Sequence, residues 1–300
     1  MMKPMRLDQH LSQAFPEISR SLLQSFIREV GVEVRGRKAV RPNTVIKEGE
    51  EVDVTAAALE AFIEQKKYSK TAQGQLLRSS LKDLPVVARL YETEGCVALD
   101  KPAGITTEQL IASEGLFSVH RLDKDTSGIL IAAKDPVAQA ALQEQWKERR
   151  VQKVYRALVI GALEPTDGAI EGGIFRSRKN RKKMAISQLP QARDAYTDYH
   201  VDSVLCDQGT EDVYSFVSFS PKTGRTHQIR VHTASIGFPI VGDATYGNLK
   251  ANKVFKERLG LGRQFLHAHK LSFVDPSTKK KVVVDSPLPP DLQKVLDSLS

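Results

Sequence analysis

The chain has 300 residues, of which 41% are hydrophobic and 27% are charged, so it is long enough to bury a substantial core. Its two cysteines, Cys96 and Cys206, are far apart, which argues against a disulfide framework and a cysteine zinc site. The formal net charge of +8 at pH 7 makes a polyanionic partner worth testing. Because no apolar run has the length of a signal peptide or a membrane span, we expect a cytoplasmic protein.

Residues 1–58 are predicted to form a small module of helices followed by short strands. Ser19 is a candidate cap for a helix that ends near Gly31, and its apolar face comprises Leu22, Leu23, Phe26, Ile27 and Val30. The alternating runs VEVRG and EEVDVT suit a small hairpin or meander. Basic residues crowd this helix and the turn after it: Arg20, Arg28, Arg35, Arg37, Lys38 and Arg41.

Residues 59–84 are predicted to be a basic linker. The stretch 66–82 has five basic residues and no acidic one, and its Ser, Gln and Gly content is typical of a connector. Residues 85–300 then form the second predicted domain.

The second domain is predicted to be α+β with a largely antiparallel mixed sheet. GCVALD and GILIAAK are apolar runs, KVYRALVIG alternates around β-branched and aromatic residues, and VYSFVSF is apolar on both faces. Asp135 and Pro136 provide a cap and a favoured first residue for a helix through VAQAALQEQWKERR.

The common nucleotide-binding, zinc-peptidase and serine-hydrolase motifs are missing, but two segments carry candidate chemistry. In SVHRLDKDTSGILIAAK, residues 118–134, a charged turn before a buried strand places Asp123 at the edge of the sheet. In the segment 220–247, a helix that starts near Thr226 places Arg230 where its guanidinium can reach a carboxylate and keep it ionised. Taken singly, either residue also fits an ordinary turn or a structural ion pair.

In chain order, HRLDKDTSG, KVYRALVIG, PKTGRTHQIRVH, FPIVGDATYG and LHAHKLSF resemble the motifs of the RluA-type family of RNA pseudouridine synthases. The match covers about residues 86–290. The N-terminal RLDQHLSQAFPEISRSLLQSFIREVGVEVRGRKAV is similar to the alpha-L (ribosomal S-four-like) RNA-binding domain, except that Arg35 stands where an asparagine is common.

The resemblance implies a cofactor-free isomerase that converts uridine to pseudouridine in RNA. It assigns the catalytic aspartate to Asp123, the tyrosine that packs against the base to Tyr155, and the arginine that pairs with the aspartate to Arg230. Arg121 matches the residue that enters the RNA where the uridine leaves. Asp123 acts either as a nucleophile or as a base, and the sequence does not separate these roles.

The other candidates are weaker. We expect His120 to hydrogen-bond backbone rather than to shuttle protons, and we expect no metal site because the pairs His227/His232 and His267/His269 lack further ligands. The run 176–184 has six basic residues and no acidic one. It is either a solvated hairpin tip or a phosphate contact, and beside an RNA-modifying site we favour the contact, through Arg181 and Lys182.

The expected substrate is a uridine in large-subunit ribosomal RNA, because the alpha-L domain usually accompanies the family's ribosomal members. Transfer RNA is the alternative substrate. Two other functions stay open: a non-catalytic RNA-binding ribosome-assembly factor, and a hydrolase that releases uracil. Nothing in the sequence requires more than a monomer.

Overall fold

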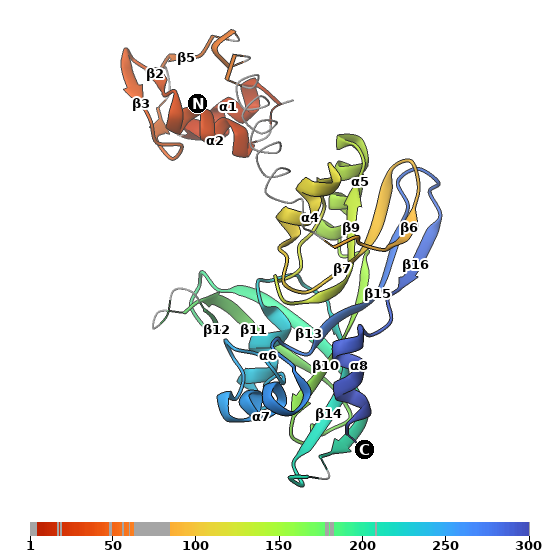
Figure 1. The fold of residues 1–300 in the computed structure, drawn as a ribbon. Coiled ribbons are helices and arrows are strands. Elements are labelled where there is room, and N and C mark those ends of the chain that lie inside the picture. Colours follow the sequence, from red (N-terminus) through yellow and green to blue (C-terminus); the bar gives the residue numbers. More distant parts are fainter. Residues whose placement is uncertain are drawn as a thin grey trace. The chain divides into compact units, whose positions relative to one another are not determined.

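The chain divides into two units, Met1–Ser80 and Leu81–Ser300 (Figure 1). The computed structural model describes residues 5–16, 18, 20–47, 50–55, 57–59, 61–62, 85–177, 180, 183–207 and 209–299. Ser19 and almost all of the predicted linker lie outside these residues. No helix in the described ranges has both the length and the apolar character needed to cross a membrane.

The N-terminal unit contains the helices and short strands that the sequence predicts. Its elements are β1 (Met5–Arg6), α1 (Leu7–Ala14), α2 (Arg20–Glu29), β2 (Val32–Val34), β3 (Arg37–Ala39), β4 (Val45–Ile46) and β5 (Val52–Asp53). Leu23, Phe26 and Ile27 of α2 are buried in the core of the unit. Val30, predicted on the same apolar face, is 38% exposed because it lies beyond the last residue of α2.

The turn between β2 and β3 contains two left-handed residues. Arg35 and Gly36 both have positive φ, 53° and 70°, so they form the two-residue connection that suits a hairpin. An asparagine would tolerate this conformation better than Arg35 does.

The C-terminal unit, Leu81–Ser300, is built on one large sheet (Figure 1). Its strands are β6 (Arg89–Glu92), β7 (Cys96–Lys101), β8 (Phe117–Ser118), β9 (Ser127–Ala133), β10 (Gln152–Ile160), β11 (Asp167–Arg176), β12 (Met184–Ile186), β13 (Arg193–Cys206), β14 (Val213–Pro221), β15 (Leu266–Val274) and β16 (Lys281–Asp285). Its helices are α4 (Thr107–Glu114), α5 (Pro136–Lys147), α6 (Gln228–Ser235), α7 (Leu249–Leu259) and α8 (Pro290–Asp297).

The strand order is β12-β11-β13-β14-β10-β15-β9-β7-β6, with β16 paired to β15 and β8 paired to β9. Every described pair is antiparallel except β9 with β15. The predicted α+β class with a largely antiparallel mixed sheet is therefore confirmed. The predicted helix is also present, and the Asp135 carboxylate caps it by accepting from the Ala138 N–H at 2.8 Å.

Strand β9 is buried on both faces and forms the centre of one half of the unit. Ile129 and Ile131 pack in the cluster that includes Leu142 of α5, whereas Leu130 packs on the opposite face with Leu110 of α4. This arrangement follows from the period-two alternation of a strand between two apolar layers.

The two halves of the sheet meet where β9 begins. There Ser127 and Gly128 pair with His267 and Ala268 of β15. Gly128 has φ 108°, and a Cβ at this position would lie 2.7 Å from the Ala268 amide nitrogen, so only glycine allows this close approach. The loop that carries Asp123 leads directly into this junction.

Candidate active site

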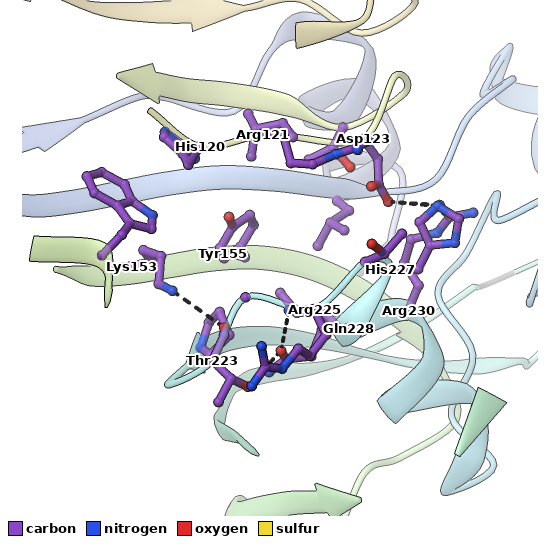
Figure 2. Close-up of a pocket in the computed structure, with 18 of the residues that line it drawn as sticks. His120, Arg121, Asp123, Lys153, Tyr155, Thr223, Arg225, His227, Gln228 and Arg230 are labelled. Atoms are coloured by element: carbon purple, nitrogen blue, oxygen red, sulfur yellow. Dashed lines mark hydrogen bonds and ion pairs between the residues drawn. The ribbon is translucent and has the colours of Figure 1, made fainter. Parts of the chain in front are cut away.

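One cavity in the C-terminal unit collects motif residues that lie far apart in the sequence. Its volume is about 290 Å³, and its wall comes from the loop before β9, the start of β10, and the segment between β14 and α6. Figure 2 shows Asp123 and Arg230 at one end, Tyr155 between the ends, and Lys153 at the other end. The sequence separates these residues, and the sheet brings them together.

Side chains outside the Asp123 loop hold this loop in place. Lys101 is fully buried, and its ammonium donates to the Lys124 carbonyl at 3.0 Å. Thr107 of α4 donates to the Leu122 carbonyl at 3.1 Å and accepts from the Leu122 N–H at 3.0 Å. Asp123 is thus fixed by its neighbours in the chain, while its own side chain stays 18% exposed at the cavity.

Arg230 binds two carboxylates at once. Its Nη1 donates to Asp123 Oδ2 at 2.9 Å, while its Nε and Nη2 donate to Asp243 Oδ2 and Oδ1 at 2.7 and 2.9 Å. The guanidinium side chain is only 7% exposed. The predicted contact of Arg230 with a carboxylate at the sheet edge is therefore present, and the carboxylate is that of Asp123.

Asp243 is a residue of this site that the sequence motifs did not identify. It is fully buried, and its Oδ1 also accepts from the backbone N–H groups of Thr245 and Tyr246 at 2.8 and 3.0 Å. An aspartate in a Gly-Asp turn directly after the apolar pair Ile240 and Val241 was the available signal, because such a carboxylate needs a partner when it is buried.

Arg230 and the two carboxylates stabilise one another's charged forms. Burial lowers the pKa of Arg230, but the hydrogen bonds and charges of Asp243 and Asp123 outweigh it and raise the pKa overall. Burial raises the pKa of Asp243, but the hydrogen bond and charge of Arg230, with the two backbone amides, lower it overall. Both groups are therefore charged at neutral pH.

The turn before α6 sets the direction of Arg230. Gln228 accepts from the Thr223 hydroxyl at 2.8 Å and from the Arg225 N–H at 2.9 Å, and it donates to the Thr197 hydroxyl at 2.9 Å. The helix begins at Gln228, two residues later than predicted, because His227 is left-handed with φ 57° and cannot be part of it.

His227 and Tyr246 pack beside the Asp123–Arg230 pair. His227 Nε2 is 3.8 Å from Asp123 Oδ2, and its Nδ1 is 2.8 Å from the Tyr246 hydroxyl. Burial lowers the pKa of His227 more than the charge of Asp123 raises it, so the imidazole is neutral at pH 7. The Arg230 guanidinium lies 5.1 Å from the centre of the Tyr246 ring, which supports its orientation.

Tyr155 forms part of the cavity wall from β10. Its ring packs against the apolar clusters on both sides of the strand junction. Burial, followed by the negative charge of Asp123, raises the pKa of its hydroxyl well above the ordinary value, so the phenol stays neutral.

His120 is held by backbone, as predicted from the sequence. Its Nε2 accepts from the Ile131 N–H at 3.1 Å, and its ring stacks on Trp146 at 4.7 Å between centroids. Burial lowers the pKa of His120 to about 3, so it is neutral under physiological conditions. Within the described ranges, no group of three or more His, Cys, Asp or Glu side chains is placed to hold a metal ion.

The predicted RNA-contacting residues fall into three groups. Arg121 is exposed at the cavity. Arg20, Arg28, Arg37 and Lys38 are all exposed on the N-terminal unit, and Arg20 also pairs with the buried Asp8 at 3.0 Å. The remaining two, Arg181 and Lys182, lie outside the described residues.

The comparison with known proteins agrees with the motifs. The family model for RNA pseudouridylate synthase matches residues 95–235. Ribosomal large subunit pseudouridine synthase D of Xanthomonas campestris is 33% identical over 98% of this chain and 88% of its own length. The protein of the same name from Neisseria meningitidis serogroup B is 34% identical over 98% of this chain and 78% of its own length.

The chain belongs to the RNA pseudouridine synthase family. It is therefore an isomerase that converts uridine to pseudouridine in RNA, and the family predicted from the RluA-type motifs is confirmed. Among solved structures, human RNA pseudouridylate synthase domain containing 1 aligns with a TM-score of 0.59 and 30% identity. That alignment covers 69% of this pseudouridine synthase and 86% of the human chain.

We predict that Asp243→Asn destabilises this pseudouridine synthase by about 3–5 kcal/mol at neutral pH, because it leaves Arg230 with one partner in a buried site. The loss is measured by urea unfolding followed by circular dichroism. The contribution of Asp243 is present above its ordinary pKa of 3.8 and disappears as the pH falls through its lower folded pKa, so the two proteins converge in acid.

Asp198→Asn is the matched control, since Asp198 pairs with Lys222 at the surface. Its expected effect is less than about 1 kcal/mol. Equal effects of the two substitutions would show that the buried position of Asp243 has no special importance.

Proposed function

We propose that this isomerase modifies uridines of large-subunit ribosomal RNA, as a monomer in the cytoplasm, with Asp123, Tyr155 and Arg230 as its catalytic residues. The substrate is supported by the names of the relatives, which are ribosomal large subunit enzymes along nearly the whole chain. The residue roles are supported by one observation above all: Arg230 holds a single oxygen of Asp123 in a cavity that Tyr155 also lines.

The two oxygens of Asp123 differ in their contacts. Oδ2 accepts from Arg230, whereas Oδ1 accepts no hydrogen bond from any side chain or amide in the described ranges. Oδ1 is thus the atom that acts on the ribose. It either attacks C1′ to release uracil or removes the C2′ proton as the bond to N1 breaks, and both roles need the charged form.

Tyr155 supports the base while it rotates. The bond from C1′ to N1 breaks, the uracil turns, C5 bonds to C1′, and the hydrogen on C5 is lost while N1 gains one, so no oxidant or group donor is consumed. Stacking on a neutral ring holds a base by about 1–3 kcal/mol without fixing its rotation about the stacking axis.

Arg121 and the N-terminal unit are proposed to hold the RNA. Arg121, exposed at the cavity, fills the place of the extruded uridine. The N-terminal unit acts as an alpha-L domain, and its exposed Arg28, Arg37 and Lys38 contact phosphates. We propose the same phosphate role for Arg181 and Lys182, on the basis of the sequence alone.

The substrate is tested by mapping pseudouridine in all RNA from a strain that lacks this protein. We expect one or more sites to be lost from large-subunit ribosomal RNA and restored by the wild-type gene. Loss confined to transfer RNA would make transfer RNA the substrate instead.

The role of Asp123 is tested with Asp123→Asn, which keeps the size of the side chain but removes its charge. We expect pseudouridine formation to fall by at least 10⁴-fold, as for other groups that act directly on the reacting atoms, while the RNA dissociation constant changes by less than about threefold. Retained activity would refute the mechanism. Release of free uracil by the wild-type protein, measured by chromatography, would instead indicate a hydrolase.

The N-terminal contacts are tested by changing Arg28, Arg37 and Lys38 together to Gln. If each contacts a phosphate, the slope of log affinity against log salt should fall by about 2–3 units, because about 0.7–0.9 unit is lost per contact. The control changes three exposed lysines of α7, Lys250, Lys253 and Lys256, to Gln. An equal decrease of the salt slope in both variants would mean that RNA affinity depends only on net charge.

A further inference from the structure

Lys153 lines the active-site cavity but has no part in the reaction described above. It lies two residues before Tyr155 on β10, at the end of the cavity opposite Asp123 (Figure 2). Its ammonium makes one long contact, to the Thr223 carbonyl at 3.5 Å, and within the described ranges it forms no ion pair with a carboxylate.

A comparison with Lys101 shows that the environment of Lys153 differs from that of a structural lysine. Lys101 is fully buried, and its three donors reach the carbonyls of Pro102, Ile105 and Lys124 at 2.8, 2.8 and 3.0 Å. Lys153 leaves most of its hydrogen-bonding capacity unused and directed at the cavity. Lys153 is half-buried, and an ammonium that has lost much of its water without gaining a partner is costly unless a ligand supplies the missing acceptor.

The charges at the two ends of the cavity point to the nature of this ligand. Arg230 is balanced by two carboxylates, whereas no carboxylate of the described residues pairs with Lys153. Burial lowers the pKa of Lys153 to about 8, which reflects the loss of water without a compensating charge. An acceptor that becomes negative during the reaction would bind this end best in the transition state.

Uracil fits this requirement in both orientations. With C1′ at Asp123, the carbonyl farthest from the sugar is O4, which lies across the ring from N1. When the base turns so that C5 faces C1′, O2 takes the place of O4, because O2 lies across the ring from C5. Between these states the free uracil is an anion whose charge is shared by N1, O2 and O4.

We propose that Lys153 donates to the carbonyl of uracil that lies farthest from the ribose, O4 before the base rotates and O2 afterwards, and so stabilises the uracil anion. The proposal rests on the proposed function, since it takes Asp123 as the group at C1′. It also gives a reason for base selection: cytosine presents an amino group in place of O4, and an ammonium cannot accept a hydrogen bond from it.

The test compares wild-type protein, Lys153→Met and Lys153→Arg on total RNA from the strain that lacks this protein. Pseudouridine formation is followed in single turnovers with the enzyme in saturating excess. We expect Lys153→Met to lower the rate by about 10²–10³-fold, the usual effect of removing one donor to a developing negative charge. The RNA dissociation constant and its salt dependence should not change.

The control is Lys222→Met, which removes a positive charge from the residue next to Thr223. Lys222 is exposed and pairs with Asp198 at 2.7 Å, so we expect its loss to change the rate by less than about threefold. Equal rate losses in both methionine variants would overturn the proposal.

The dependence on pH provides a second readout that does not need a substitution. The ammonium is required, so the second-order rate constant of the wild type should fall as the pH rises through about 8. Lys153→Arg should keep its smaller rate over this range, because a guanidinium stays charged. Among the other titratable groups that face this part of the cavity, His120 and His227 stay neutral and the Tyr155 phenol stays protonated between pH 7 and 9. The guanidinium groups of Arg121 and Arg225 also face this part of the cavity.

Two results would refute the proposal while leaving the proposed function intact. One is a Lys153→Met protein whose single-turnover rate is within threefold of the wild type. The other is a variant that keeps this rate but binds RNA more weakly, with a salt slope lower by about one unit, since that would identify Lys153 as a phosphate contact. If the wild type itself forms no pseudouridine, the proposed function fails first.

Discussion

The buried guanidinium of Arg230 is the interaction on which the site depends. It joins three segments that are distant in the chain: the loop before β9, helix α6 and the turn at Asp243. Burying an arginine with two carboxylates is favourable only when their hydrogen-bonding groups are satisfied, and here the backbone amides at Thr245 and Tyr246 complete the shell of Asp243. The hydrogen-bonding capacity of Asp243 is thereby used, which leaves Asp123 for the catalytic role that we propose.

Much of this arrangement was readable from the sequence because it is local. The strands β7, β9, β10 and β14 and the capped helix α5 follow from periodicity and turn residues. The pairing of Arg230 with Asp123, 107 residues earlier in the chain, follows instead from the resemblance to the family motifs. Asp243 and Lys153 were not found, because their importance comes from burial and from neighbours far along the chain. The apolar pair before the Gly-Asp turn indicates that Asp243 is buried, but it does not indicate that Arg230 is its partner.

The parallel pairing of β9 with β15 was also not predicted from the sequence, because it too depends on residues far apart in the chain. Short turns indicate antiparallel neighbours, whereas this contact joins two strands that are far apart in the sequence of the C-terminal unit. It is nonetheless the contact that orients the site, since the Asp123 loop ends there and Gly128 allows the two backbones to approach. The glycine of the TSG motif is thus explained by packing rather than by chemistry.

The position of Asp123 also resolves an apparent conflict between the protein's charge and its reaction. A chain with a formal charge of +8 attracts phosphates, yet the catalytic group that we propose is negative. Asp123 is only 18% exposed and neutralised on one side by Arg230, so its field toward solvent is weak. In the proposed function, phosphates are held by the exposed cations outside the cavity, while an uncharged uracil enters it. On the same proposal, the base acquires its charge only after entry, when the bond to the ribose breaks, at the end where Lys153 lies.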